Sequence, residues 1–347
     1  MTLNRKSLFW LAAATGSALG AYALVRRLRE TNLRGQVVLV TGGSRGLGFL
    51  LAREFALEGA RVALCARDPE ELSRAQAELE TRGVEVYPIR TDVADRDQVA
   101  RMIDDVTESL GQVDILVNNA GIMEVGPIQT MGLENFERAM DIMFWGPLHA
   151  IRAVLPAMLD RKNGTIVNIT SIGGKISFPH LLPYCAAKFA LVGLSEGLHA
   201  ELHNQGVNVV TVVPGFMRTG SYQQAFFAGN QKQEFEWFAL GASLPLVSMD
   251  AVRAARQIVR AVKGGESQPI LSLPANLIAR FHGLFPGTTN RLLALVNHFL
   301  PGPGQQGFTK GQELQRDIDS TLFQEATRLG SEAADRLQSR GVPEFET

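Results

Sequence analysis

The sequence predicts an α/β fold in which a doubly wound, seven-stranded parallel sheet carries helices on both faces. From Gly35 onward, short β-branched runs alternate with longer stretches of helical periodicity. The strand candidates are continuous apolar runs, which is typical of strands that are covered on both faces. A chain of 347 residues, 46% of them hydrophobic, is long enough for one such domain with an extension at each end.

Seven segments are predicted as strands because each is a short apolar run rich in β-branched residues. They are residues 37–40, 61–65, 84–89, 113–117, 165–169, 207–213 and 269–271. The segments between them have helical spacing. The predicted helices are one that follows a glycine turn and ends near Glu58, and then 70–81, 95–110, 133–159, 184–203 and 250–262. Asp95 is expected to cap the third of these helices.

The N-terminal segment differs from the rest of the chain. Residues 8–25 (LFWLAAATGSALGAYALV) carry no charge and have basic residues on both sides. Because roughly 20 apolar residues span a bilayer as a helix, residues 1–30 are predicted to form a membrane anchor. The heavier basic flank follows the segment, which favours a cytoplasmic location for the rest of the chain. Two alternatives are a cleaved signal peptide ending near Ala21-Tyr22-Ala23 and a helix packed on the domain.

The C-terminal residues 273–347 are predicted to be a helical extension of a central domain at 33–272. Residues 274–300 are apolar with helical spacing, interrupted at Pro286-Gly287 and ended by residues 301–304 (PGPG). Residues 309–340 are polar and fit either one amphipathic helix or a loosely held tail.

Charge and cysteine content exclude several classes of protein. The net charge of −1 gives no electrostatic argument for nucleic-acid binding. Cys65 and Cys185 lie outside any C-x-x-C or Cys/His cluster, so neither a zinc site nor a disulfide framework is expected. His199 and His203 share a helix face but lack a third ligand, so no metal site is expected.

Residues 41–48 (TGGSRGLG) follow the first predicted strand and open a helix. Glycines let the backbone turn tightly and approach a pyrophosphate, and the helix N-terminus offers free N–H groups and a positive dipole end. The alternative, a tight turn that binds nothing, does not require three glycines and an arginine. The segment therefore predicts a dinucleotide-phosphate site.

Tyr184 and Lys188 are four residues apart on a predicted helix and so share a face. A phenol with a pKa of about 10 gives up its proton poorly near neutrality, and a nearby cation lowers that pKa. A tuned phenol can donate a proton to an alkoxide or accept one in reverse. The Ser171 hydroxyl could polarise a carbonyl oxygen. Taken alone, the Tyr–Lys pair would also fit an ordinary half-exposed helix face.

In their order and spacing, these segments resemble the classical short-chain dehydrogenase/reductase family over about residues 33–271. The motifs that carry the resemblance are TGxxxGxG at 41–48, NNAG at 118–121, Ser171 thirteen residues before Tyr184-x-x-x-Lys188, Pro214-Gly215 after the sixth strand, and Thr219.

The resemblance implies a Rossmann-type catalytic domain that interconverts a carbonyl and an alcohol with a nicotinamide cofactor. It implies that Tyr184 is the acid/base, that Ser171 polarises the carbonyl, and that Lys188 tunes Tyr184 and contacts the nicotinamide ribose. The cofactor-binding residues it implies are Gly42, Ser44, Arg45, Gly46, Leu47, Gly48, Arg67, Asp92, Val93, Asn119, Ala120, Gly121, Tyr184, Lys188, Pro214, Gly215 and Thr219.

One position departs from the family pattern. The family usually has an asparagine where this chain has Met143. That asparagine is thought to hold a water in a proton relay to the lysine, whereas a thioether is a weak acceptor and donates nothing. The Ser–Tyr–Lys trio is intact, so we expect an altered relay rather than an inactive enzyme.

The charges near the second strand indicate the cofactor. NAD-preferring relatives place an acidic residue at the end of this strand, where this chain has Ala66 followed by Arg67. Arg45 supplies a second cation, and two guanidinium groups suit a 2′-phosphate. NADP(H) is therefore expected. The alternative is that both are plain surface arginines, and the nearby Asp68 counts slightly against the phosphate.

The substrate is less well indicated. Where the family carries its substrate lid, this chain has aromatic residues that fit either an apolar pocket for a lipophilic substrate or packing of the lid on the body. They are Tyr222, Phe226, Phe227, Phe235, Trp237 and Phe238.

The leading hypothesis is a membrane-associated NADP(H)-dependent carbonyl reductase, or the reverse dehydrogenase, acting on a lipophilic small molecule. The alternatives are a 3-oxoacyl thioester reductase of fatty-acid type, against which the anchor and the C-terminal extension count, and a non-catalytic NADP(H)-binding protein. The resemblance also suggests a homodimer or homotetramer.

Overall fold

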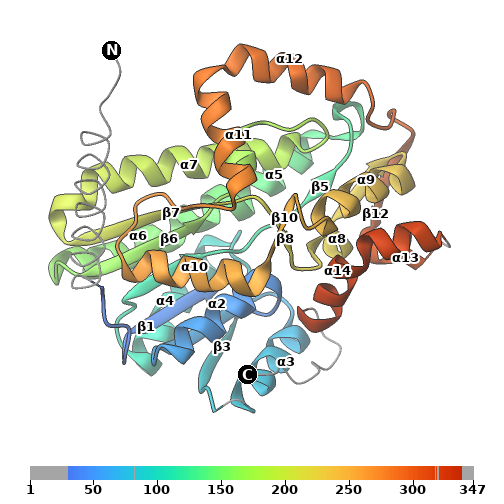
Figure 1. Ribbon diagram of the computed structural model, residues 1–347. Helices are drawn as coiled ribbons and strands as arrows, with labels where there is room; N and C mark the ends of the chain where they lie inside the picture. The colour runs from blue at the N-terminus through green and yellow to red at the C-terminus, as the bar shows by residue number, and fades with distance from the viewer. Residues whose placement is uncertain (1–29, 82, 317, 319, 338–347) are drawn as a thin grey trace, which may run out of the picture.

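A computed structural model describes residues 30–81, 83–316, 318 and 320–337 (Figure 1). Its central sheet has seven strands in the order β11-β7-β6-β4-β1-β2-β3, and every pair in it is parallel. The strands are β1 (Val37–Thr41), β2 (Arg61–Ala66), β3 (Val86–Arg90), β4 (Ile115–Asn118), β6 (Gly164–Ile169), β7 (Val207–Pro214) and β11 (Ile270–Leu271). The predicted doubly wound sheet is confirmed. The predicted N-terminal apolar helix lies outside the described residues.

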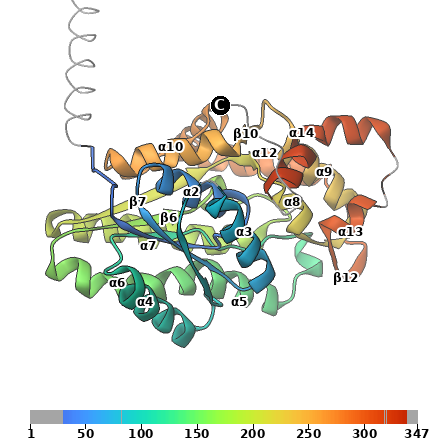
Figure 2. The same cartoon turned by 90° about the horizontal axis from the view of Figure 1, so that it is seen from below.

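Helices cover both faces of this sheet, as Figure 2 shows. On one face lie α2 (Gly46–Leu57), α3 (Pro69–Glu80) and α10 (Ala251–Lys263), which bury residues such as Leu50 and Ile258 against the strands. On the other lie α4 (Arg96–Leu110), α5 (Leu133–Met140), α6 (Gly146–Asp160) and α7 (Leu182–Leu202), with Val99 and Ile151 in a second core. Asp95 caps α4 as predicted, because its carboxylate accepts hydrogen bonds from the first-turn N–H groups.

The helix predicted over 133–159 is confirmed as one helical run, Leu133–Asp160, which contains a π-helical turn. This turn, Asp141–Trp145, separates α5 from α6. Gly146 follows the turn directly, and a Cβ there would lie 2.8 Å from the Val93 carbonyl oxygen, so the chain approaches the neighbouring loop closely at this point. Among the described residues, the run Leu133–Asp160 is the helix long and apolar enough to cross a membrane, but it packs on the sheet through residues such as Met143 and Val154.

After β7 the chain forms the predicted helix α10, strand β11 and two helices over 273–297, together with elements that the sequence did not predict. A second sheet joins β5 (Glu124–Val125), β9 (Phe226–Gly229) and β12 (Gln305–Lys310). The remaining elements are β8 (Phe216–Arg218), α8 (Ser221–Gln224), α9 (Gln231–Ser243), β10 (Ser248–Asp250), α11 (Leu273–Leu284), α12 (Pro286–Asn297), α13 (Gly311–Arg316) and α14 (Thr321–Leu337). The polar segment expected to be one helix or a tail is therefore a strand followed by two helices.

The aromatic residues of the 220–240 region form a core of their own. Tyr222, Phe227, Phe235 and Phe238 are fully buried and contact one another ring to ring. Residues of the C-terminal extension, including Leu314, complete this cluster. These four side chains pack the lid on the extension, which agrees with the packing alternative rather than with an apolar substrate pocket.

Candidate active site

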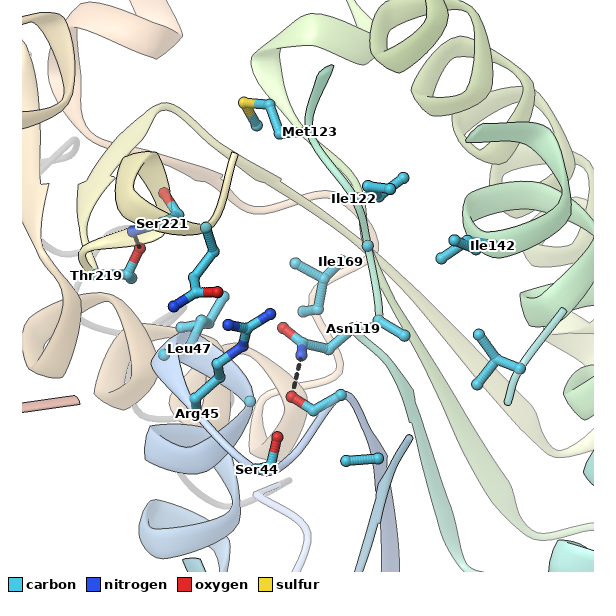
Figure 3. A pocket seen from close by; sticks show the side chains of 18 of the residues that line it. Ser44, Arg45, Leu47, Asn119, Ile122, Met123, Ile142, Ile169, Thr219 and Ser221 are labelled. Carbon is cyan, nitrogen blue, oxygen red and sulfur yellow. Dashed lines mark hydrogen bonds between the residues drawn. The ribbon is translucent and has the colours of Figure 1, made fainter. Parts of the chain in front are cut away.

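A cavity of about 980 Å³ lies at the carboxyl edge of the sheet, where β1 and β4 adjoin and the strand order reverses. Open parallel sheets bind ligands at this kind of switch point. Every residue that the sequence analysis proposed for catalysis or cofactor binding lines this cavity. Figure 3 shows Arg45 and Thr219 reaching it from one side and Ile142 from the other.

The glycine loop forms a closely fitted cradle against the end of β4. Asn119 donates from its amide nitrogen to the backbone oxygens of Thr41 (3.0 Å) and Gly42 (3.1 Å). The Thr41 hydroxyl accepts in turn from the Asn119 and Ala120 N–H groups. A Cβ at Gly48 would overlap the Gly42 carbonyl oxygen and lie 2.5 Å from the Asn119 amide. Because only glycine fits at position 48, the loop can hold this tight turn, and its backbone N–H groups can face a bound phosphate at the start of α2.

Two arginines and two carboxylates line the part of the cavity beside the residues that follow β2. Arg45 lies 3.5 Å from Glu71, whose carboxylate also accepts a hydrogen bond from Ser44. Arg67 lies 3.9 Å from Asp92 and is largely exposed. Asp68, the residue that counted against a phosphate site, instead caps α3 through its first-turn N–H groups. These backbone hydrogen bonds hold the pKa of Asp68 below its usual value.

Ser171, Tyr184 and Lys188 come together from two elements. Ser171 follows β6 and opens a short 3₁₀ turn, Ile172–Gly174, while Tyr184 and Lys188 lie one turn apart at the start of α7. The Ser171 and Tyr184 side chains lie close together, since a Cβ at Gly173 would be 3.0 Å from the Tyr184 ring and 3.4 Å from the Ser171 hydroxyl oxygen. The Lys188 ammonium lies 5.8 Å from the centre of the Tyr184 ring and donates to the Ile169 carbonyl at 2.8 Å. The trio is therefore assembled around one point of the cavity wall.

Burial sets the acid–base properties of Tyr184 and Lys188. Burial raises the pKa of Tyr184 to about 12, although the hydrogen bond with Ser171 opposes that shift. Burial also lowers the pKa of Lys188 to about 8. The net pKa shift of Tyr184 is upward because the loss of hydration of the phenolate outweighs the other effects. The role of Lys188 in tuning Tyr184 stays a prediction. Tyr184 is thus a protonated phenol at neutral pH.

Met143, at the family's asparagine position, is fully buried. It lies in the π-helical turn, and its sulfur is 3.5 Å from where a Cβ of Gly121 would lie. It therefore fills space behind the NNAG segment and offers no donor there. Buried polar contacts are found nearby, where Asn168 bonds both Asn118 (2.9 Å) and Ser195 (2.9 Å), which fixes α7 on the sheet.

The sequence analysis missed several residues of the cavity wall, among them Glu71, Gln224 and Lys310, whereas Phe226 is the one predicted lid aromatic that lines it. Glu71 could have been found, since it lies in the first turn of the helix that follows the second strand. Lys310 had no local signal, because it reaches the cavity only through the pairing of β12 with β9, which sets it opposite Phe226.

A glycine cradle at the carboxyl edge of a parallel sheet, joined in one cavity to a Ser–Tyr–Lys trio, defines a nicotinamide-dependent oxidoreductase. The model of the short chain dehydrogenase family matches residues 36–228. The chain therefore belongs to the short-chain dehydrogenase/reductase family. It is an oxidoreductase of the kind that interconverts alcohols and carbonyls.

Individual relatives agree with this assignment. Dehydrogenase/reductase SDR family member 7B of Bos taurus is 32% identical over 80% of this chain and 87% of that protein. A crystal structure of a short-chain dehydrogenase from Streptomyces avermitilis is 30% identical, covers 76% of this chain and 97% of its own, and has a TM-score of 0.65. A metagenomic short-chain oxidoreductase in complex with NADP is 29% identical, covers 70% of this chain and 97% of its own, and has a TM-score of 0.57.

Proposed function

We propose that this protein is an NADP(H)-dependent carbonyl reductase in which Tyr184 donates the proton and Ser171 and Lys188 assist it. The observation that carries the proposal is the contact of Ser171 and Tyr184, beside Lys188, in the cavity that the glycine loop also lines. A cofactor-oxidation screen over steroids, retinoids, long-chain keto-lipids and acyl thioesters tests it. We expect NADPH-linked turnover of at least one of these carbonyl classes.

The roles of the three side chains follow from their positions. A bound nicotinamide supplies or accepts the hydride. The Ser171 hydroxyl donates a hydrogen bond to the substrate oxygen and polarises it. Tyr184 then donates its proton to the alkoxide, and this is favourable because an alcohol is a weaker acid than a phenol even at a pKa of about 12. The Lys188 cation stabilises the phenolate that remains.

The pH dependence of reduction follows from Lys188. Its ammonium loses its proton above about pH 8, while Tyr184 stays protonated up to about pH 12. We expect kcat/KM for carbonyl reduction to fall about tenfold per pH unit above that point, since reduction uses the phenol and the cation together. Alcohol oxidation should instead accelerate with rising pH until the cation is lost, because it needs the phenolate. A reduction profile that stays flat to about pH 10 would contradict a role for the Lys188 charge.

NADP(H) is proposed as the cofactor because Arg45 and Arg67 lie at the cavity end beyond β2 and no acidic side chain follows that strand directly. Replacing both, as Arg45→Ala with Arg67→Ala, should weaken NADPH binding by about 100-fold and leave NADH binding nearly unchanged. Titration of nicotinamide fluorescence measures both affinities. The matched control is Arg74→Ala on the same side of the molecule, which should change neither. Equal losses for the two cofactors would refute the phosphate site.

A lipophilic substrate remains part of the proposal, although the buried aromatic core does not support it. The support comes from Met123, Met217 and Phe226, which line the cavity. A 3-oxoacyl thioester is the alternative substrate, and the screen distinguishes the two. If NADPH binds but no carbonyl in the screen is reduced, a non-catalytic binding protein becomes the better account.

We also propose that residues 1–30 anchor the chain in a membrane with its catalytic domain, 33–272, in the cytoplasm, and that residues 273–347 extend that domain. The support is the uncharged segment 8–25 with its basic flanks. Full-length protein should resist extraction from membranes by alkaline carbonate. Recovery of the uncleaved chain in the soluble fraction would exclude the anchor.

A homodimer or homotetramer is proposed on family resemblance. Light scattering of the detergent-solubilised protein measures the mass of the assembly and so the number of its subunits.

A further inference from the structure

Residues 273–299, which comprise α11, Phe285, α12 and the two residues after it, form what we call the apolar hairpin. Large apolar side chains are exposed along its whole length, with relative exposures from 38% to 80%. They are Leu273, Leu277, Ile278, Phe281, Leu284, Phe285, Leu292, Leu295, Val296 and Phe299. In Figure 1 the two helices project from the body, with α12 outermost. Soluble surfaces rarely expose so continuous an apolar area unless something binds it.

Only a few hairpin residues hold it to the domain. Ala275 is buried, and Ala279 and Leu293 pack against Ile172 and Ile176 of the segment that follows Ser171. In α12, Thr289 is the only buried residue. The helices therefore present most of their circumference outward, rather than the single exposed polar face of a helix packed on a core.

The charges of the apolar hairpin indicate which kind of partner can cover its exposed side chains. Residues 267–312 contain no aspartate or glutamate, whereas Arg280 and Arg291 lie exposed on the hairpin. Two copies that packed this patch face to face would bring their arginines together without a carboxylate from the patch to neutralise them. An apolar surface with basic residues and no acidic ones matches the interface of a bilayer that contains anionic lipids.

We propose that the apolar hairpin inserts its exposed side chains into the headgroup boundary of an anionic membrane, as a second contact separate from residues 1–30. Such a contact lies in the plane of the bilayer and does not span it. It would hold the segment after Ser171, on which the hairpin packs, close to the membrane surface.

Environment-sensitive fluorescence on the full chain tests the proposal. Single cysteines introduced as Leu284→Cys and Phe299→Cys are labelled with a nitrobenzoxadiazole probe, with Ser73→Cys on α3 as the control. The native Cys65 and Cys185 are almost completely buried and should not react under native conditions. On vesicles of phosphatidylcholine and phosphatidylglycerol, the hairpin probes should shift to the blue and be quenched by brominated lipid, while the control probe stays unchanged. Two hairpin positions guard against a local folding defect.

The basic residues are tested in the same assay. Arg280→Gln with Arg291→Gln should reduce insertion of the hairpin probes by about fivefold for each arginine removed. The matched control, Arg74→Gln with Arg101→Gln, changes two exposed arginines elsewhere and should have no effect. The proposal is overturned if the hairpin probes remain in water while the protein sediments with the vesicles. It is equally overturned if they are already shifted without vesicles, because a second copy or the N-terminal segment would then cover the hairpin.

Discussion

Tyr184→Phe should lower kcat for carbonyl reduction by about 100- to 10,000-fold while leaving NADPH affinity nearly unchanged. The substitution removes only the hydroxyl that meets Ser171, and the ring keeps its place beside Lys188. Without the phenol, no acid of the trio lies beside Ser171, because the Lys188 ammonium is 5.8 Å from the centre of the ring and donates to the Ile169 carbonyl. Steady-state turnover and nicotinamide fluorescence measure the two quantities separately.

The chain offers a matched control in Tyr222→Phe. Tyr222 is also buried, its hydroxyl contacts the Ser331 hydroxyl at 3.0 Å, and it does not line the catalytic cavity. Its loss should cost about 1 kcal/mol of stability and leave kcat unchanged. Unchanged turnover by Tyr184→Phe on every accepted carbonyl would show that another group donates the proton.

Gly48→Ala should abolish tight cofactor binding, because the added Cβ has no room. It would overlap the Gly42 carbonyl oxygen, and the Asn119 amide that holds the loop would lie 2.5 Å away. To make room, the loop must move out of the position in which its N–H groups face a phosphate. We expect NADPH affinity to fall at least tenfold, on the order of 1.4 kcal/mol or more. The free energy of unfolding should fall by about 1–3 kcal/mol.

Gly197→Ala is the control for this substitution. Gly197 lies within α7, and a Cβ there meets nothing within 4 Å. Alanine should stabilise the helix by up to about 1 kcal/mol and leave cofactor affinity unchanged. Calorimetry and fluorescence titration compare the two variants directly. Equal cofactor affinity of Gly48→Ala and the wild-type protein would mean that the loop does not hold the phosphates.

The central sheet could be predicted because its determinants are local. Most strands are short apolar runs with few exposed residues, and the helices between them show their own periodicity. The trio was predictable for a different reason, since the spacing of Ser171, Tyr184 and Lys188 resembles that of the short-chain dehydrogenase/reductase family. The glycine loop is local in the same sense.

The remainder depends on contacts that no local pattern encodes. Lys310 reaches the cavity only because β12 pairs with β9, so that a residue near the end of the chain lies opposite Phe226. The π-helical turn holds Met143, whose sulfur lies 3.5 Å from where a Cβ of Gly121 would be, and no local pattern encodes that contact. The direction of the Tyr184 pKa shift depends on how completely the fold buries the phenol, which spacing does not reveal.

Transfer of deuterium from 4-deuterated NADPH to a carbonyl substrate tests the central claim most directly. Each cofactor stereoisomer is incubated with the screened carbonyls, and the alcohol products are analysed by mass spectrometry. The account predicts that the wild-type protein places one deuterium on the former carbonyl carbon from one of the two isomers, and that Tyr184→Phe nearly eliminates this product. Binding of NADPH by the wild-type protein without any deuterated alcohol across all carbonyl classes would contradict it.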